Sequence, residues 1–286
     1  MKTVNKSDIC AILTTFNPDN EFYSRVARIS SQVSRVIIVN DSGRNESIIG
    51  LAEFENVEVI YNEFNSGIAY ALNRGVKVAT EKGFKCFLTF DDDTVIDENY
   101  VNEIIQFIKQ HPELNIGVIA LARESDKDSS SEDVNYRVKR TLITSGSFFT
   151  LDTFEKINGF NEDLFIDLVD YDFTTKIRKN GFKLIQLKKQ GMWHSVGELK
   201  IQKLFGISFR VYNHSPFRLY YQVRNSFFFL KEFLFFDSAL SLLLFSHIFH
   251  ILFKAIIFEK SKKQRLYFIT LGLFDGLFNR LGKIRD

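Results

Sequence analysis

Short apolar runs alternate with segments of helical periodicity along the first half of the chain. The apolar runs predict strands at residues 9–14, 36–40, 57–61 and 86–90. The remaining segments predict helices at residues 19–33, 45–54, 67–82 and 97–110, the last with Asp97 as its N-cap. This alternation is typical of βαβ units, so we expect an α/β fold with a mostly parallel central sheet flanked by helices.

The following part of the chain is less regular. Residues 123–139 are polar and contain three consecutive serines, which predicts a loop. Strands are expected at residues 141–150 and 182–187, and a helix at residues 168–180 that stops at Gly181.

Polar residues follow each of the first four predicted strands. In an open parallel sheet, ligands bind beyond the carboxyl ends of the strands, and these ends meet along one edge. The candidate binding segments at this edge are residues 14–18 (TTFNP), 40–43 (NDSG), 62–67 (NEFNSG) and 91–93 (DDD).

Three consecutive aspartates, residues 91–93, place like charges close together at the end of an apolar strand. Such carboxylates repel one another unless they share a cation, and their hard oxygen ligands suit Mg²⁺ or Mn²⁺. A divalent ion here would neutralise a substrate diphosphate as it departs. The alternative is a solvated turn whose aspartates cap the next helix.

A second acidic group contains Asp167, Asp170 and Asp172. On a helix, Asp170 and Asp172 are about 200° apart, so only one of them can face a cleft. A carboxylate held near an acceptor hydroxyl can act as a general base. The alternative is that these acids stabilise the positive end of the helix dipole.

Composition excludes several classes of protein. An apolar content of 45% with only three prolines excludes a disordered or collagen-like chain, and two cysteines cannot form a disulfide framework. Cys10 and Cys86 both lie in apolar runs and are expected to be buried thiols. The first residues are charged and precede only a short apolar run, so we expect no signal segment and a cytosolic protein.

The net charge of +2 conceals an asymmetry. Residues 201–286 contain 13 Lys/Arg and 5 Asp/Glu, a net charge of +8, which leaves −6 for residues 1–200. Many of the 31 phenylalanines also lie in this basic part. Basic charge mixed with Phe and Leu, without a nucleic-acid-binding motif, favours an anionic membrane surface as partner over nucleic acid.

Two helices are predicted in this tail. Residues 238–258 are long enough to span a membrane, but their polar residues form a stripe within an arc of about 100°. Residues 264–281 are amphipathic as well. The basic residues between the two helices are Lys260, Lys262, Lys263 and Arg265.

Helices that lie in the plane of the membrane interface account together for the polar stripe, the basic charge and the phenylalanines. Three alternatives remain open: a membrane span, packing on the preceding domain, and pairing of two copies of the chain through these helices.

The motifs, taken in order, resemble those of glycosyltransferase family 2, the inverting enzymes of GT-A fold. They are residues 12–18 (ILTTFNP), 40–42 (NDS), 65–69 (NSGIA) and 90–93 (FDDD). The motifs similar to the rhamnosyltransferase branch of the family are residues 145–147 (SGS), 164–172 (LFIDLVDYD) and 214–225 (HSPFRLYYQVRN). The resemblance covers about residues 8–226.

The resemblance implies roles for individual residues. Asp41 would contact the nucleobase and Asp91 the ribose, and Asp93 would bind the metal with His194 close to it. The other donor-binding residues would be Thr15, Asn17, Asn65, Gly67 and Asp92.

On the acceptor side, the resemblance makes Asp170 the catalytic base and gives Asp172, Arg218 and Arg224 contacts with acceptor or phosphate. This chain has Asp172 where the branch has Glu, and Lys176 where the branch has Arg. The residues alone leave an alternative for each group. His194 could be a packed histidine that binds no ligand, and Arg218 and Arg224 could lie on the ordinary exposed face of a helix.

We therefore expect a GT-A domain at residues 1–226 and a helical, membrane-associating tail at residues 227–286. The expected activity is inverting transfer of L-rhamnose from dTDP-L-rhamnose to a lipid-linked glycan of a bacterial surface polysaccharide. The enzyme would be peripheral, at the cytoplasmic face of the cell membrane. The alternatives are another donor, such as a UDP-hexose or UDP-galactofuranose, and a non-catalytic nucleotide-sugar-binding protein.

Overall fold

The computed structural model describes residues 4–43, 50–126, 134–194, 200–204, 207–211, 215–258 and 260–284. The chain divides into two compact units. Unit 1 comprises Met1–Asn161 and Asp170–Ser195, and unit 2 comprises Glu162–Val169 and Val196–Asp286. The predicted boundary between residues 226 and 227 falls inside helix α6 (Pro216–Phe233) of unit 2.

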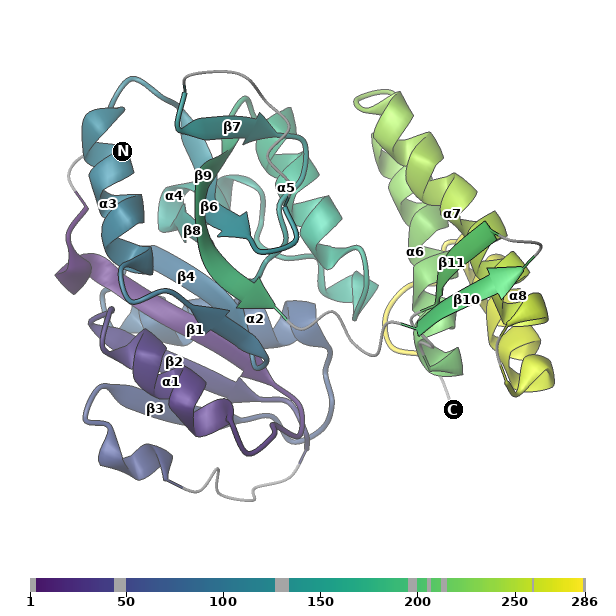
Figure 1. Ribbon diagram of the computed structural model, residues 1–286, viewed down its shortest axis with the longest axis horizontal. Helices are drawn as coiled ribbons and strands as arrows, with labels where there is room; N and C mark the ends of the chain where they lie inside the picture. Colours follow the sequence, from purple (N-terminus) through teal and green to yellow (C-terminus); the bar gives the residue numbers. More distant parts are fainter. Residues whose placement is uncertain are drawn as a thin grey trace. The chain divides into compact units, whose positions relative to one another are not determined.

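Unit 1 is built on one sheet, which contains nine strands of the described residues (Figure 1). They are β1 (Ile9–Thr15), β2 (Arg35–Asn40), β3 (Val57–Tyr61), β4 (Cys86–Asp91), β5 (Thr94–Ile96), β6 (Ile116–Arg123), β7 (Tyr136–Lys139), β8 (Ser147–Thr150) and β9 (Lys183–His194).

The strand order is β3-β2-β1-β4-β8-β6-β9-β5, with β7 paired to β9. The pairs β2–β3, β1–β2, β1–β4 and β6–β9 are parallel, whereas β5, β7 and β8 run antiparallel to their partners. The predicted mostly parallel sheet is confirmed. Because β1, β2 and β4 are parallel, their carboxyl ends lie along one edge, as the motif analysis requires.

Helices cover both faces of this sheet. They are α1 (Phe22–Ser30), α2 (Ile68–Glu81), α3 (Tyr100–Gln110), α4 (Leu151–Lys156) and α5 (Val169–Lys179). In Figure 1, α1 and α3 lie in front of the sheet, and both contribute to one apolar core with β1, for example through Val26, Ile104 and Leu13. On the opposite face, the Phe173 ring of α5 stacks on Phe160 at a centroid distance of 4.1 Å.

Several elements differ from the sequence prediction. Strands β5, β6 and β7 and helix α4 were not predicted, and β7 lies inside the predicted loop at residues 123–139. The predicted strand at residues 141–150 is limited to β8. Within the predicted helix at residues 45–54, the structure describes a 3-10 turn at Leu51–Glu53, while residues 45–49 lie outside the described part of the chain.

Two local predictions can be compared directly. The N-cap of α3 is Asn99, two residues after the predicted Asp97, whose Oδ1 accepts a hydrogen bond from the Asn99 amide at 3.0 Å. Cys10 and Cys86 are buried free thiols as predicted. Burial raises the pKa of Cys10 to about 12 and that of Cys86 to about 11, so both remain protonated.

The described residues of unit 2 include three α-helices and a hairpin. The elements are α6, α7 (Ser238–Ile257), α8 (Lys262–Leu277), and the antiparallel pair β10 (Lys200–Leu204) and β11 (Ile207–Val211). Leu219 and Val223 of α6 share a core with Ile248 and Ile251 of α7 and Ile269 of α8. Because α6 belongs to this core along its length, the helical unit starts before residue 227.

Glycines bring α8 close to α6. A Cβ at Gly272 would lie 2.6 Å from the carbonyl oxygen of Tyr220, and one at Gly276 would lie 2.9 Å from Cβ of Phe227. Only glycine therefore fits at these two positions without a shift of the neighbouring helix.

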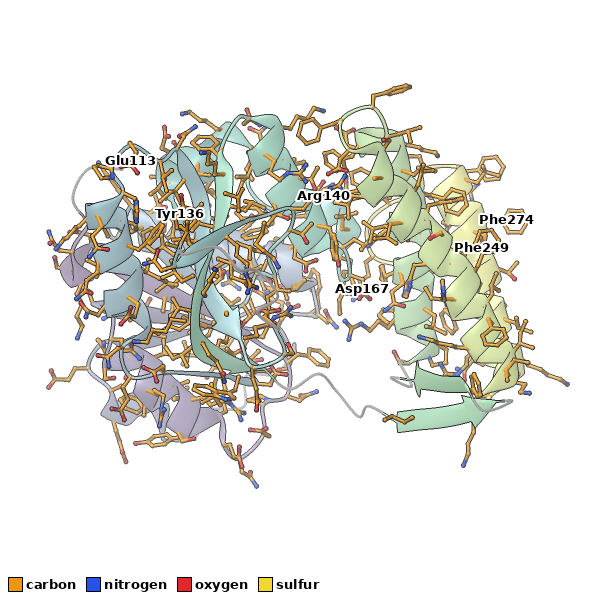
Figure 2. All side chains as sticks on the ribbon, turned by 45° about the horizontal axis from the view of Figure 1, so that its top comes forward. Glu113, Tyr136, Arg140, Asp167, Phe249 and Phe274 are labelled. Atoms are coloured by element: carbon orange, nitrogen blue, oxygen red, sulfur yellow. The ribbon has the colours of Figure 1, made fainter. Side chains whose placement is uncertain are left out.

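The outer surfaces of α7 and α8 are rich in exposed apolar side chains. Phe249 is 67% exposed and Phe274 is 57% exposed, and both lie at the edge of the helical unit in Figure 2. Other exposed members of this apolar surface are Phe235, Phe236, Leu242, Leu243, Phe253, Ile256, Ile257, Leu266, Tyr267, Leu277 and Phe278. Among the described residues, α7 is the one helix with the length and mean hydropathy (2.0) of a membrane span.

The predicted basic hinge needs one correction. Lys260, Lys262 and Lys263 are exposed, but Arg265 is only 5% exposed because its Nε donates to the carbonyl oxygen of Lys260 at 2.9 Å. Arg265 therefore closes the α7–α8 connection and is not part of the charged surface.

Candidate functional site

Asp92 ties the aspartate turn to the end of β1. Its Oδ2 accepts hydrogen bonds from Thr15 Oγ1 at 2.9 Å and from the Phe16 amide at 3.2 Å. Burial raises the pKa of Asp92, and these two hydrogen bonds act in the opposite direction. The next residue of the β1 end, Asn17, is exposed and has a left-handed backbone with φ 57°. The structure thus brings Thr15 and Asp92 together, as the strand ends predict.

Asp41 organises the loop between β3 and α2. Its Oδ1 accepts hydrogen bonds from Asn62 Nδ2 at 2.6 Å and the Ser66 amide at 2.9 Å, and its Oδ2 accepts one from the Gly67 amide at 2.9 Å. Asn65 Oδ1 also accepts from the Gly67 amide, at 3.2 Å. Asp41 is 6% exposed, so its first role is to shape the loop that carries Asn65 and Gly67. A contact between Asp41 and a nucleobase stays a prediction.

Ser145 holds the aspartate turn from the other side. Its Oγ accepts a hydrogen bond from the Asp91 amide at 3.2 Å and lies 2.6 Å from Thr94 Oγ1. Asp91, Asp92 and Asp93 are all half-buried. The turn is therefore fixed at both ends while its carboxylates remain partly accessible.

Asp93 and His194 are the predicted metal ligands. In the β5–β9 ladder, Thr94 is paired with His194, so the backbone brings residue 194 next to the aspartate turn. The side chain of His194 lies outside the described part of the chain. Among the side chains that are described, no three of His, Cys, Asp or Glu are grouped as metal ligands. Mg²⁺ usually takes one or two carboxylates and completes its shell with substrate phosphates and water, so a half-buried carboxylate such as that of Asp93 suits it.

Asp170 lies in the first turn of α5. Its Oδ1 accepts a hydrogen bond from the Tyr171 amide at 2.9 Å. It lines a cavity of about 190 Å³ together with Ser145 and Met192. Ser145 also binds the Asp91 amide, so one residue of the cavity wall contacts the aspartate turn.

A polar network in the same cavity was not predicted. Arg123 Nη2 donates to Asp126 Oδ1 at 2.9 Å, and Gln186 Nε2 donates to Asp126 Oδ2 at 2.8 Å. Burial opposes ionisation of Asp126, but the hydrogen bonds from Arg123 outweigh it and lower the pKa of Asp126. The signal for this network in the sequence was the pair Arg123 and Asp126 directly after an apolar run. Both residues fall within the predicted loop at residues 123–139.

Asp172, for which an acceptor contact was predicted, is 0% exposed, and its carboxylate pairs with Lys176 Nζ at 2.8 Å on the same helix. The two departures from the branch pattern thus form one ion pair between a buried carboxylate and a partly exposed lysine. This pair links successive turns of α5, and the acceptor contact of Asp172 stays a prediction.

Arg224, for which an acceptor or phosphate contact was predicted, is 0% exposed, and its guanidinium donates to backbone carbonyl oxygens of unit 2, including that of Asp163 at 3.0 Å. Arg218 differs, because 43% of its side chain is exposed although its Nη2 pairs with Asp167 Oδ1 at 3.0 Å. A substrate contact stays a prediction for both arginines, and Arg218 is the more accessible of the two.

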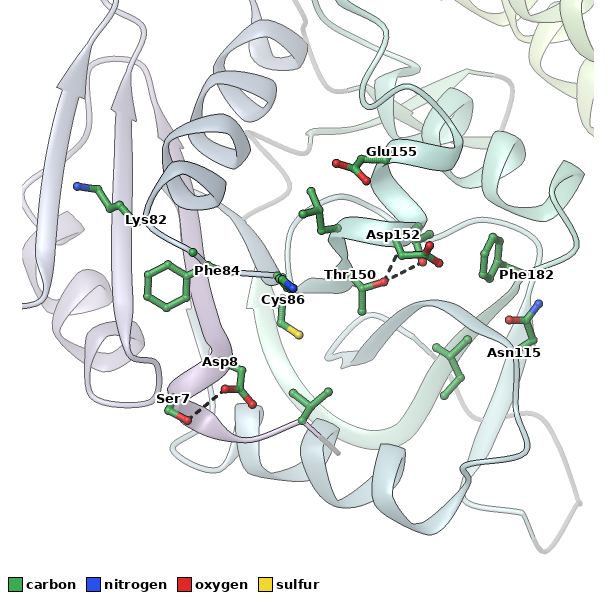
Figure 3. A pocket seen from close by; sticks show the side chains of 16 residues that line it. Ser7, Asp8, Lys82, Phe84, Cys86, Asn115, Thr150, Asp152, Glu155 and Phe182 are labelled. Atoms are coloured by element: carbon green, nitrogen blue, oxygen red, sulfur yellow. Dashed lines mark hydrogen bonds between the residues drawn. The ribbon is translucent and has the colours of Figure 1, made fainter. Parts of the chain in front are cut away.

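A larger cavity lies elsewhere. It has a volume of about 820 Å³ and is lined by Asp8, Lys82, Cys86 and Thr150, among others (Figure 3). Cys86 begins β4 and Asp91 ends it, so this cavity opens at the amino end of the strand. None of the predicted site residues lines it.

Comparison with protein families matches residues 10–169 to Glycosyl transferase family 2. The curated dTDP-rhamnosyl transferase RfbF of Shigella flexneri is 26% identical over 242 residues, which cover 79% of this chain and 81% of that protein.

Solved structures with a similar fold include S. aureus TarS residues 1–349, with a TM-score of 0.60 and 14% identity over 96% of this chain and 82% of that one. The same TarS fragment in complex with UDP-GlcNAc has a TM-score of 0.60 and 15% identity over 94% of this chain and 81% of that one. GalNAc-T7 with UDP, GalNAc and Mn²⁺ has a TM-score of 0.52 and 12% identity over 69% of this chain and 44% of that one. At these identities the likeness concerns the fold, and it confirms the predicted fold class.

Proposed function

Since the chain belongs to glycosyl transferase family 2, we propose that it transfers L-rhamnose from dTDP-L-rhamnose to a hydroxyl group of a lipid-linked glycan. The observation that carries the proposal is the similarity to a dTDP-rhamnosyl transferase, which extends over 79% of this chain, well beyond the residues of the family match. The biological context we propose is the synthesis of a bacterial surface polysaccharide such as O-antigen.

The proposed reaction is a single displacement with inversion. Asp170 takes the proton of the acceptor hydroxyl as the acceptor oxygen attacks the anomeric carbon, and the bond from that carbon to the nucleoside diphosphate breaks. Asp170 suits this role because it lines the cavity that reaches Ser145 at the aspartate turn.

The donor end of the reaction is assigned to the strand edge. We propose that the loop shaped by Asp41, with Asn65 and Gly67, lies along the nucleotide, and that Asp91 is near the ribose. Asp93 and His194 would hold a Mg²⁺ or Mn²⁺ ion, which stabilises the negative charge of the leaving diphosphate when it is bound. Asp92 supports this edge through its hydrogen bonds to Thr15 and Phe16.

Donor identity is tested with a panel of nucleotide sugars. We expect dTDP-L-rhamnose to give the highest rate of nucleoside diphosphate release, and we expect acceptor to increase that rate. Higher release from a UDP-hexose or UDP-galactofuranose would reassign the donor. Binding of a donor without release of diphosphate from any member of the panel, with lipid-linked glycan present, would favour a non-catalytic binding protein.

We also propose that unit 2 attaches the enzyme to the cytoplasmic face of the membrane. The apolar surface of α7 and α8 and the exposed lysines of their connection combine the two interactions that bind interfacial helices. A lone span by α7 is less suitable, because its Ile248 and Ile251 pack against α6 and α8, which carry Lys231 and Asp275. Binding in the plane of the interface suits all three helices.

Changing Lys260, Lys262 and Lys263 together to Ala is expected to weaken binding to anionic vesicles about 100-fold. Each basic residue near such a surface contributes about 1 kcal/mol, and three of them correspond to about two powers of ten. Co-sedimentation with phosphatidylserine vesicles at low salt measures the change.

The matched control for the lysine variant changes three exposed lysines of unit 1, Lys77, Lys85 and Lys109, to Ala. It removes the same charge and should bind vesicles like the unchanged protein. Equal weakening by both variants would indicate a nonspecific charge effect. Resistance of the membrane-bound protein to alkaline carbonate would favour a span.

A further inference from the structure

The segment just before Asp170 has a backbone that bulky residues rarely adopt. Phe165, Asp167 and Leu168 have φ values of 64°, 63° and 60°. Elsewhere among the described residues, positive φ is limited to glycines, three asparagines and Ser261. Left-handed backbone is unfavourable for phenylalanine and leucine, and it persists only where surrounding structure imposes it.

Two neighbouring side chains of α6 impose this conformation. Asn225 Nδ2 donates toward three carbonyl oxygens of the segment, those of Leu164 at 3.1 Å, Ile166 at 2.8 Å and Asp167 at 2.8 Å. Arg224 Nη2 donates to the carbonyl oxygens of Asp163 and Leu164, each at 3.0 Å. Both Arg224 and Asn225 are 0% exposed, so these bonds are shielded from water.

The far end of the chain completes the same arrangement. The Gly282 amide donates to the carbonyl oxygen of Asp163 at 2.7 Å, and Arg224 Nη1 donates to the carbonyl oxygen of Gly282. Tyr221 stacks on the Phe165 ring at a centroid distance of 4.9 Å and accepts a hydrogen bond from the Ile284 amide at 2.9 Å. Residues 163–168 are therefore held by α6 and by the residues that follow α8.

We infer that Arg224 and Asn225 are positioning residues for the catalytic base. They hold residues 163–168, in which Phe165, Asp167 and Leu168 are left-handed, and Asp170 follows this segment after only Val169. The backbone is thus held up to two residues before the carboxylate that must meet the acceptor hydroxyl. The inference rests on the proposed role of Asp170 as base.

The choice of residues supports positioning over simple folding. A loop that only connected two elements would relax or would use glycine, as the chain does at Gly146 and Gly181, where φ is 76° and 80°. Here bulky residues are kept left-handed by the buried donors of Arg224 and Asn225. Such stored strain is common where a reactive group needs one fixed position.

The test compares Leu168→Gly with Leu168→Val, because glycine accepts a positive φ and a β-branched residue resists it. Transfer kcat, donor KM and the melting temperature are measured for both. We expect Leu168→Gly to retain a kcat within about threefold of the unchanged enzyme. We expect Leu168→Val to lose about tenfold or more in kcat with an unchanged donor KM, as expected for an interaction that matters only in the transition state.

Asn225→Ala and the double variant Asn225→Ala/Leu168→Gly give the second comparison. Asn225→Ala should lower kcat about tenfold or more at unchanged donor KM, and adding Leu168→Gly should restore part of the loss because the left-handed conformation then no longer needs the clamp. If Asn225→Ala does not fold, the two Leu168 variants decide alone.

Two results would overturn the inference. In the first, Leu168→Val and Asn225→Ala have the same kcat as the unchanged enzyme, while Asp170→Asn abolishes transfer. Asp170 would then remain the proposed base, but Arg224 and Asn225 would not position it. In the second, the loss of kcat in Asn225→Ala is accounted for by its lower melting temperature, and adding Leu168→Gly does not restore kcat. Full transfer by Asp170→Asn would instead contradict the proposed function itself.

Discussion

Replacing Asp170 by Asn is expected to lower the rate of sugar transfer by about 10²–10⁴-fold, the range that general-base catalysis contributes. The amide has the shape of the carboxylate and can still accept the hydrogen bond from the Tyr171 amide, but it cannot take the proton of the acceptor hydroxyl. Because the base acts on the acceptor, the dissociation constant of the donor should change little. Calorimetric titration with donor and transfer kinetics measure the two quantities separately.

Asp172→Asn is the matched control for this substitution. It makes the same chemical change two residues away, at a side chain that is 0% exposed and paired with Lys176. We expect a lower melting temperature, because a buried ion pair is broken, with a smaller loss of kcat per folded molecule. A larger kcat loss in Asp172→Asn than in Asp170→Asn would show that the base is misassigned.

The product should carry an α linkage formed from a β-linked donor, and retention would contradict single displacement.

Chelation of divalent cations is expected to reduce transfer by about 100-fold or more, and Mg²⁺ or Mn²⁺ should restore it. Stabilisation of a departing diphosphate by a metal ion contributes several kcal/mol, which corresponds to at least two powers of ten in rate. Asp93→Asn should lose activity to a similar extent. It should also need a higher metal concentration to reach half of its own maximal rate. Titration of activity against metal concentration measures both effects.

Asp152→Asn serves as the control for Asp93→Asn. Its side chain is 71% exposed and lines the large cavity at the amino end of β4, so the same change there should leave metal dependence unaltered. Full turnover in chelator, with both ions absent, would contradict the metal assignment.

The strands of the first half could be predicted because each is a continuous apolar run between turn residues. β1, β2 and β4 are buried along almost their whole length, which such runs encode directly. β5 and β7 contain three and four residues, too few to show an alternating pattern. β9 continues through Lys188 and Lys189 because it pairs with β5, β6 and β7, and that pairing is not visible in the local sequence.

The site was predictable where function depends on residue type at a strand end, and less so where it depends on burial. Arg224 and Asp172 have the composition of substrate-binding residues, yet one binds backbone carbonyl oxygens and the other binds Lys176. Every residue type has the same backbone carbonyl group. The sequence therefore does not show which carbonyl oxygens a buried arginine will bind. Arg265 was misassigned to the charged surface for the same reason.

Gly272 and Gly276 restrict how the helical unit can change during evolution. The atom nearest to a Cβ at 272 is the carbonyl oxygen of Tyr220, which belongs to the backbone and cannot rotate away. A relative with a larger residue there must have wider helix spacing. At 276 the neighbouring atoms belong to the Phe227 side chain and include its Cβ at 2.9 Å, so alanine at 276 should occur together with glycine at 227 or with wider helix spacing. Exposed positions of α7 and α8 can drift independently among apolar residues, whereas positions 276 and 227 should covary.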